Sequence, residues 1–154
     1  MTKIFLYDWG GVPSLRRELQ VMGYGVLCQK NSPLDSDADD PELLSYARDR
    51  RNLIVLTDDK DMNIFIEDED DKDPGIELNK NTSKVQVDTV NTKGEFEVTK
   101  TNNKRWRIKD SGPGSHNGIV IYQQEDAHNP STLVNKIDEH ISKNSVHNMV
   151  KDLT

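Results

Sequence analysis

Four aspartates stand where an apolar segment ends or where a helix is expected to begin: Asp8, Asp40, Asp59 and Asp61. Asp8 directly follows the apolar run Ile4–Tyr7, and Asp59 follows the run Leu53–Leu56 at a short distance. Carboxylates that meet within a few ångströms raise one another's pKa or require a cation between them. Mg²⁺ and Mn²⁺ bind oxygen ligands and keep several waters, so such a group suits metal-assisted attack on a phosphodiester. Each acid taken alone also fits a helix cap, a turn or a solvated position.

The order of the apolar segments explains why these acids would meet. Lys3–Tyr7, Tyr24–Cys28 and Leu53–Leu56 are predicted strands, and the segments between them have helical spacing. Continuous apolar strands that alternate with helices predict a parallel sheet covered on both faces. Ligands of such sheets bind beyond the carboxyl ends of the strands, where Asp8 and Asp59 stand.

Two helices are predicted between these strands. The first begins near Pro13 and ends at Gly23, and the second begins at Asp40, with Pro41 in its first turn. The residues expected to face the core are Leu15, Leu19 and Met22 in the first helix and Leu43, Leu44 and Ala47 in the second.

The pattern changes after this α/β unit. Met62–Ile66 is predicted to begin another helix, and Glu67–Asp73 is predicted to be an acidic loop. Ile76–Lys109 alternates like half-buried strands around a hairpin turn at Asn91–Gly94, which predicts a β-rich insertion over residues 67–115. The remaining predicted elements are a fourth parallel strand at Gly118–Tyr122, a helix at Pro130–Ser142 and a short helix at Ser145–Leu153.

The length of 154 residues fits a single domain, 1–154, with this insertion inside it. The net charge of −7 excludes a uniformly basic nucleic-acid-binding protein, but it leaves room for a local basic patch. Residues 35–73 hold fifteen acids and five bases, whereas residues 80–109 hold eight bases and three acids. The single cysteine, Cys28, excludes an internal disulfide framework. Because no apolar run is long enough for a membrane helix or a signal peptide, we expect a soluble, cytoplasmic protein.

The basic segment contains a tetrapeptide that suits contact with a nucleic acid, Lys104-Arg105-Trp106-Arg107. An aromatic ring among bases can stack on a nucleobase while the bases bind phosphates. Strand alternation equally fits a Trp106 buried in the insertion, with the bases on its solvated face. His116 is a further candidate for substrate contact, or simply a loop cap, and Thr57 is expected to orient a water or a phosphate.

Five motifs occur in an order that resembles the PIN-like nuclease superfamily, in its branch of small toxin-like proteins. They are Phe5-Leu6-Tyr7-Asp8, Gly23-Tyr24-Gly25-Val26, Asp40-Pro41-Glu42-Leu43-Leu44, Leu56-Thr57-Asp58-Asp59-Lys60-Asp61-Met62 and His116-Asn117-Gly118-Ile119. The resemblance covers residues 1–66 and 116–154. Two features depart from the family pattern: Trp9-Gly10 stands where many members have Glu-Asn, and short members lack the insertion.

This resemblance implies a three-layer α/β/α fold and a ribonuclease that depends on Mg²⁺ or Mn²⁺. The implied metal ligands and catalytic residues are Asp8, Asp40, Asp59 and Asp61. RNA would be the substrate, held by the basic insertion, and an antitoxin protein would be the partner if the chain is the toxin of a toxin–antitoxin pair. A homodimer is left open, and no membrane contact is expected.

Two other functions remain open. The departure at Trp9-Gly10 motivates a catalytically inactive PIN-like binding or regulatory module. The placement of Asp8 and Asp59 also resembles a response-regulator receiver, in which the third strand ends in the phospho-acceptor. A receiver, however, carries an acidic pair after its first strand and a lysine after a late apolar strand, and here Gln123-Gln124 follows Gly118–Tyr122.

Overall fold

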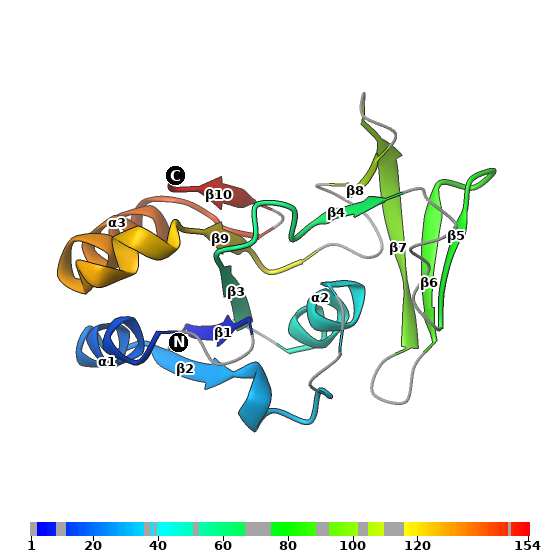
Figure 1. Cartoon of the computed structure of the whole chain (residues 1–154). Coiled ribbons are helices and arrows are strands. Elements are labelled where there is room, and N and C mark those ends of the chain that lie inside the picture. The colour runs from blue at the N-terminus through cyan, green and yellow to red at the C-terminus, as the bar shows by residue number, and fades with distance from the viewer. Residues whose placement is uncertain are drawn as a thin grey trace.

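The computed structural model describes residues 3–8, 12–35, 38, 40–50, 53–66, 75–88, 93–101, 105–109, 116–147 and 149–154. Over these residues the chain is a mixed α/β protein with one parallel and one antiparallel sheet. The two sheets lie side by side, with the helix α2 (Asp40–Arg48) between them (Figure 1).

The parallel sheet has five strands, which are β1 (Ile4–Tyr7), β2 (Gly25–Cys28), β3 (Leu53–Thr57), β9 (Ile119–Ile121) and β10 (Val150–Asp152). Their order across the sheet is β10, β9, β3, β1, β2. The register places Ile4 opposite both Gly25 and Leu53, and Val55 opposite Ile119. The fourth parallel strand predicted from the sequence is therefore confirmed as β9, and β3 is buried along its whole length.

One face of the parallel sheet is covered by two helices, α1 (Pro13–Val21) and α3 (Pro130–Lys143). Alternate strand residues such as Phe5, Ile54 and Val120 point to this side, because successive side chains of a strand face opposite sides of the sheet. The helices contribute apolar stripes at helical spacing, which are Leu15 and Leu19 in α1 and Leu133, Val134, Ile137 and Ile141 in α3. Short 3₁₀ helices follow β2 at Gln29–Asn31 and β9 at Gln124–His128.

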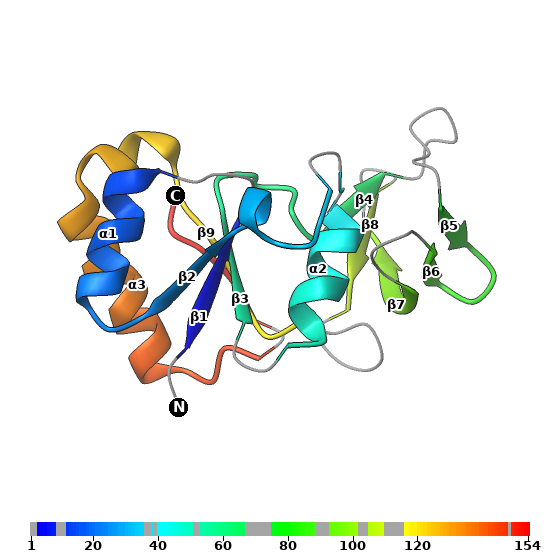
Figure 2. The ribbon, with the colours of Figure 1, turned by 90° about the horizontal axis from the view of Figure 1, so that it is seen from below.

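The opposite face is covered by α2 together with the antiparallel sheet. That sheet consists of β4 (Ile64–Ile66), β5 (Ile76–Asn79), β6 (Lys84–Asp88), β7 (Lys93–Lys100) and β8 (Arg105–Ile108), in the order β4, β8, β7, β6, β5. Leu6, Val55 and Ile121 of the parallel sheet share one buried cluster with Phe96 and Trp106 of the antiparallel sheet. Figure 2 shows the resulting layers, with α1 and α3 on one side of the parallel strands and α2 and the antiparallel sheet on the other.

A cation links α2 to the antiparallel sheet. The guanidinium of Arg48 donates a hydrogen bond to the Glu95 carbonyl oxygen at 3.2 Å and lies 5.0 Å from the ring centroid of Phe96. A Cβ atom at Gly94 would come within 2.7 Å of this guanidinium, so a larger residue there would shift the Arg48 side chain from its present position. This contact joins the second helix to the insertion through both a hydrogen bond and a cation–π interaction.

Two helix predictions were wrong, and in both cases the segment adds a strand to a sheet edge. Met62–Ile66 was predicted to begin a helix, but Ile64–Ile66 is β4, paired antiparallel with Arg105–Ile108. Ser145–Leu153 was predicted to be a helix, but Val150–Asp152 is β10, paired parallel with β9. Short segments depend on tertiary context, and an open strand edge offers backbone partners that an isolated short helix lacks.

Smaller details also differ from the sequence expectation. Lys93 and Gly94 lie in β7 rather than in a turn, because Asp88 pairs directly with Lys93. Met22 is 42% exposed and follows the end of α1, so it does not extend the core face of that helix. The predicted acidic loop, Glu67–Asp73, lies outside the described residues. No helix in the described part of the chain has the length and apolar character needed to cross a bilayer.

The shared core predicts that both sheets unfold together. Phe96 is completely buried, and its replacement by alanine should lower the free energy of unfolding by about 3–5 kcal/mol. We would measure urea denaturation by far-ultraviolet circular dichroism and by the fluorescence of Trp106 in a Trp9→Phe background. The two probes should report one coincident transition in the parent and in Phe96→Ala.

Val21→Ala is the matched control, because Val21 is 76% exposed at the end of α1. Its effect should be within about 0.5 kcal/mol. If Phe96→Ala shifted the fluorescence transition and left the circular dichroism midpoint in place, the two sheets would not share a cooperative core.

Candidate functional site

The site is built where the chain order of the parallel strands reverses direction. From β1 the chain moves outward to β2 on one side, then crosses to β3 and continues to β9 on the other side. Open α/β sheets bind ligands in the crevice beyond the carboxyl ends of the strands at this switch point. Here the two strands are β1, followed by Asp8, and β3, which ends at Thr57 and leads to Asp59.

Thr57 connects the two aspartates. Its hydroxyl donates a hydrogen bond to Asp8 Oδ2 at 3.1 Å and accepts one from the Asp59 backbone N–H at 3.0 Å. The Asp59 carboxylate accepts a hydrogen bond from the Asp61 backbone N–H at 2.9 Å. Because Thr57 is only 1% exposed, its side chain is held in place by packing, and the three residues form a defined polar group.

The electrostatics of this group disfavour a negative charge on Asp8. Burial raises the pKa of the Asp8 carboxyl, the hydrogen bond from Thr57 lowers it, and the nearby charges of Asp58 and Asp59 raise it again, with a net increase. Burial also raises the pKa of the Tyr122 hydroxyl, which follows β9, and the charges of Asp58 and Asp8 raise it further. A cation placed between these carboxylates would relieve the unfavourable interaction.

The other two predicted ligands lie differently. The Asp61 carboxylate forms an ion pair with Arg105 of β8, with 2.9 Å between Oδ2 and Nη1. Asp40 is the first residue of α2 and is not part of the hydrogen bonds that join Asp8, Thr57 and Asp59. Among the described residues, no three histidine, cysteine, aspartate or glutamate side chains lie close enough to hold one metal ion together.

The basic segment is not the open cationic surface that its composition suggests. Arg105 pairs with Asp61, and Trp106 is 6% exposed and packs in the core between the two sheets, so its ring is not available for stacking on a base. Arg107 is exposed, and Lys104 lies outside the described residues. Further lysines of this sheet face acids on neighbouring strands, as in the pairs Lys84–Glu95, Lys93–Asp88 and Lys109–Glu97.

His116 does not belong to the same edge of the sheet. It precedes β9 and therefore lies at the amino ends of the parallel strands, opposite the edge that carries Asp8. It is fully buried, and its Nδ1 accepts a hydrogen bond from the Gly118 backbone N–H at 3.1 Å. The structure therefore gives His116 the role of a loop cap, the second of the two roles considered from the sequence.

Sequence reasoning missed a set of polar groups beneath Asp8 on the side of α1. The Tyr7 hydroxyl is buried and has no hydrogen-bond partner among the described residues, and burial raises its pKa. Arg16 of α1 donates a hydrogen bond to the Cys28 sulfur at 3.1 Å, at the end of β2. The available signal was positional, because Tyr7 and Cys28 are the last residues of neighbouring parallel strands.

Fold and site together define an α/β protein with a carboxylate group at the switch point of a parallel sheet. No family model matches the chain, and no curated protein or solved structure shows significant similarity to it.

The raised pKa of Asp8 predicts a pH-dependent cost to stability. Between the ordinary value of 3.8 and the raised value, the folded protein binds more protons than the unfolded chain, so stability falls as pH rises through this window. Asp8→Asn removes the titration and keeps an acceptor for Thr57. The variant should therefore be more stable than the parent at pH 7, and the difference should disappear below pH 3.8.

Chemical denaturation at a series of pH values measures this effect. Asp88→Asn is the control, because Asp88 is an exposed residue of β6 and its replacement should leave the pH profile unchanged. A variant Asp8→Asn that was less stable than the parent at pH 7 would contradict the prediction.

Proposed function

We propose that the protein is a ribonuclease of the PIN-like type that depends on Mg²⁺ or Mn²⁺. The observation that carries this proposal is the buried hydroxyl of Thr57, which binds the Asp8 carboxylate and the Asp59 backbone N–H at the switch point of the parallel sheet. In open α/β sheets, the loops at this position commonly hold binding and catalytic residues.

The residues present fit a hard divalent cation. Mg²⁺ is commonly bound by one or two carboxylates, with waters and substrate phosphates completing its coordination. Asp8 and Asp59 supply two such carboxylates. Burial and the neighbouring negative charges raise the pKa of Asp8, and a bound cation would lower it by stabilising the charged form. When bound, the ion would stabilise charge on a transferring phosphate and activate a water.

The protein's own residues would have distinct roles. Asp8 and Asp59 would hold the cation, and Thr57 would fix the orientation of both. Asp61, bound to Arg105, would hold the loop after β3 in position rather than bind the cation directly. Asp40 would approach the same edge from the start of α2, because a helix that connects two parallel strands begins beyond their carboxyl ends and runs back toward their amino ends.

The resemblance noted in the sequence supports the same reading. Its motif Leu56–Met62 begins in the last two residues of β3, and its late motif, His116–Ile119, leads into β9. The proposal extends to RNA as substrate and to an antitoxin protein as partner, both of which rest on the resemblance alone.

Replacement of either central carboxylate should remove activity and leave the fold intact. Asp8→Asn and Asp59→Asn should each lower Mn²⁺-dependent cleavage of single-stranded RNA by at least about 100-fold, because the metal would lose a ligand. Cleavage assays with circular dichroism spectra of each variant measure both properties. Asp88→Asn is the matched control and should cleave like the parent. Unchanged cleavage in both site variants would refute the assignment.

The connecting hydroxyl gives a second prediction for the same assay. Thr57→Val keeps the shape of the side chain but removes the hydrogen bonds to Asp8 and Asp59, and it should lower cleavage by about 10–100-fold. Thr57→Ser retains the hydroxyl and should recover most of the activity. Equal losses in the two variants would show that packing, rather than the hydroxyl, is what matters at this position.

A receiver-like phospho-acceptor is the second candidate, and the strand order favours it. The order β2, β1, β3, β9, β10 is that of flavodoxin-like sheets, in which the same switch point carries the ligand. Against this role, Gln123 and Gln124 follow β9 where a receiver carries its lysine.

Acetyl phosphate with Mg²⁺ separates the two candidates. In a phospho-acceptor, the phosphoryl group would move to the carboxylate of Asp58 or Asp59, and acetate would leave. Intact mass spectrometry would detect this addition. RNA cleavage without a mass gain would support the nuclease, and absence of both, with no Mn²⁺ binding near Asp8, would favour an inactive binding module.

A further inference from the structure

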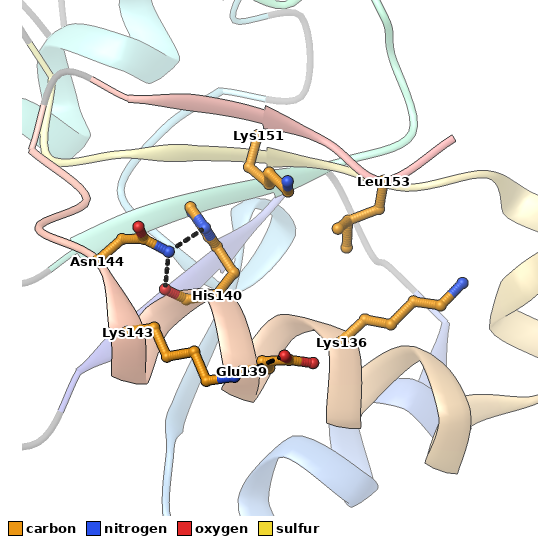
Figure 3. Close-up of a pocket in the computed structure, with 7 residues that line it drawn as sticks. All are labelled: Lys136, Glu139, His140, Lys143, Asn144, Lys151 and Leu153. Carbon is orange, nitrogen blue, oxygen red and sulfur yellow. Dashed lines mark hydrogen bonds and ion pairs between the residues drawn. The ribbon is translucent and has the colours of Figure 1, made fainter.

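A second concave site lies between α3 and β10. It is a cavity of about 320 Å³ at the outer edge of the parallel sheet. Lys151 and Leu153 line it from the C-terminal strand segment, and the other side chains come from α3 and its C-cap (Figure 3). Those side chains are Lys136, Glu139, His140, Lys143 and Asn144.

The cavity carries excess positive charge. Lys143 pairs with Glu139 at 2.8 Å, four residues earlier on α3. Within the described part of the chain, no ion pair reaches Lys136 or Lys151. This distinguishes the cavity from the antiparallel sheet, where several lysines face acids, and two uncompensated ammonium groups around one hollow attract an anion.

The histidine and the asparagine of the cavity are hydrogen-bonded to each other. His140 is 6% exposed, and its Nδ1 lies 3.3 Å from the Asn144 side-chain amide, which also donates to the His140 carbonyl oxygen at 3.0 Å. Burial lowers the pKa of His140, and the positive charges of Lys151 and Lys3 lower it further. Because His140 uses both hydrogens of the Asn144 amide, the groups left to donate to an oxyanion are the lysine ammonium groups and the second ring nitrogen of His140.

The side chains that line the cavity suit a phosphate group. The cavity is lined by three lysines, a histidine and an asparagine, and Glu139, its one carboxylate, is bound to Lys143. Among the described residues that line it, Leu153 is the one apolar side chain and none is aromatic, so this lining offers no platform for stacking a base. A tetrahedral oxyanion with several acceptor oxygens matches this set of donors.

We propose that the cavity between α3 and β10 binds a phosphate group, either as free inorganic phosphate or as part of a polynucleotide backbone. This site is separate from the carboxylate group beyond β1 and β3, and the proposal does not depend on nuclease activity. Phosphate binds through its oxygens to Lys136 and Lys151, next to the His140 ring that Asn144 holds in place.

Nuclear magnetic resonance of the full chain tests the proposal with inorganic phosphate as the probe. The ring signals of His140 and the side-chain amide signals of Asn144 should shift and saturate as phosphate is added. Sodium chloride at matched ionic strength should not produce these shifts. The signals of His128 and His147, which lie outside the cavity, should stay unchanged.

Charge-removing variants identify the groups that bind. Lys136→Gln and Lys151→Gln should each weaken phosphate binding by about tenfold, because each removes one charged hydrogen bond. Lys30→Gln is the matched control, since Lys30 is an exposed lysine of the 3₁₀ helix after β2 and makes no contact with the cavity. The control should bind phosphate like the parent.

A short oligouridylate distinguishes the two sources of the phosphate group. If it displaces inorganic phosphate from the His140 signals, the ligand is a polynucleotide backbone; if phosphate binds and the oligonucleotide does not compete, the ligand is a small phosphate. Absence of saturable shifts, or equal shifts in the parent and in Lys136→Gln/Lys151→Gln, would overturn the proposal. Because neither readout requires RNA cleavage, failure here leaves the nuclease proposal untouched.

Discussion

The arrangement of this protein depends on the burial of the second face of its parallel sheet. A parallel sheet exposes an apolar surface on both sides, and only α2 among the described helices covers the side that carries Leu6, Val55 and Ile121. Phe96 and Trp106 of the antiparallel sheet complete the cover. The β-rich segment is therefore part of the hydrophobic core, and its alternation of buried and exposed residues follows from having one side on that core and one in water.

The same contact holds the loop that carries the candidate site. The segment from Asp58 to Asn63 connects β3 of one sheet to β4 of the other, so both of its ends are fixed. Met62 is completely buried, the Asn63 carbonyl oxygen accepts a hydrogen bond from the Ile108 N–H at 3.1 Å, and Arg105 binds the carboxylate of Asp61. The position of Asp59 thus depends on residues that follow it in the chain by some fifty positions, and Arg105 of the antiparallel sheet supports this loop through Asp61.

Much of this fold could be predicted from local sequence pattern. The short strands and the ion pairs could not, because they depend on contacts between distant segments of the chain. The apolar runs of β1, β3 and β9 and the helical spacing of α1 and α3 are strong local signals, and they predicted these elements and the parallel sheet that they form. β4 and β10 are three residues long, and their state is decided by the strand edge available to each. Charge composition could not show that Asp61 pairs with Arg105, or that lysines would remain uncompensated beside β10, because ion pairing between strands depends on register.

The chain order of the two sheets also determines how the molecule can assemble. β3 pairs with β9 in the centre of the parallel sheet, yet the whole antiparallel sheet lies between them in the sequence. During synthesis, β1, β2 and β3 emerge with one edge of β3 unpaired until the second sheet has been made and β9 has followed it. Such long-range pairing carries a large loop-closure entropy and slows folding. We therefore expect a nascent chain that pauses with an open apolar strand edge, which is the stage at which a chaperone or a premature partner would bind.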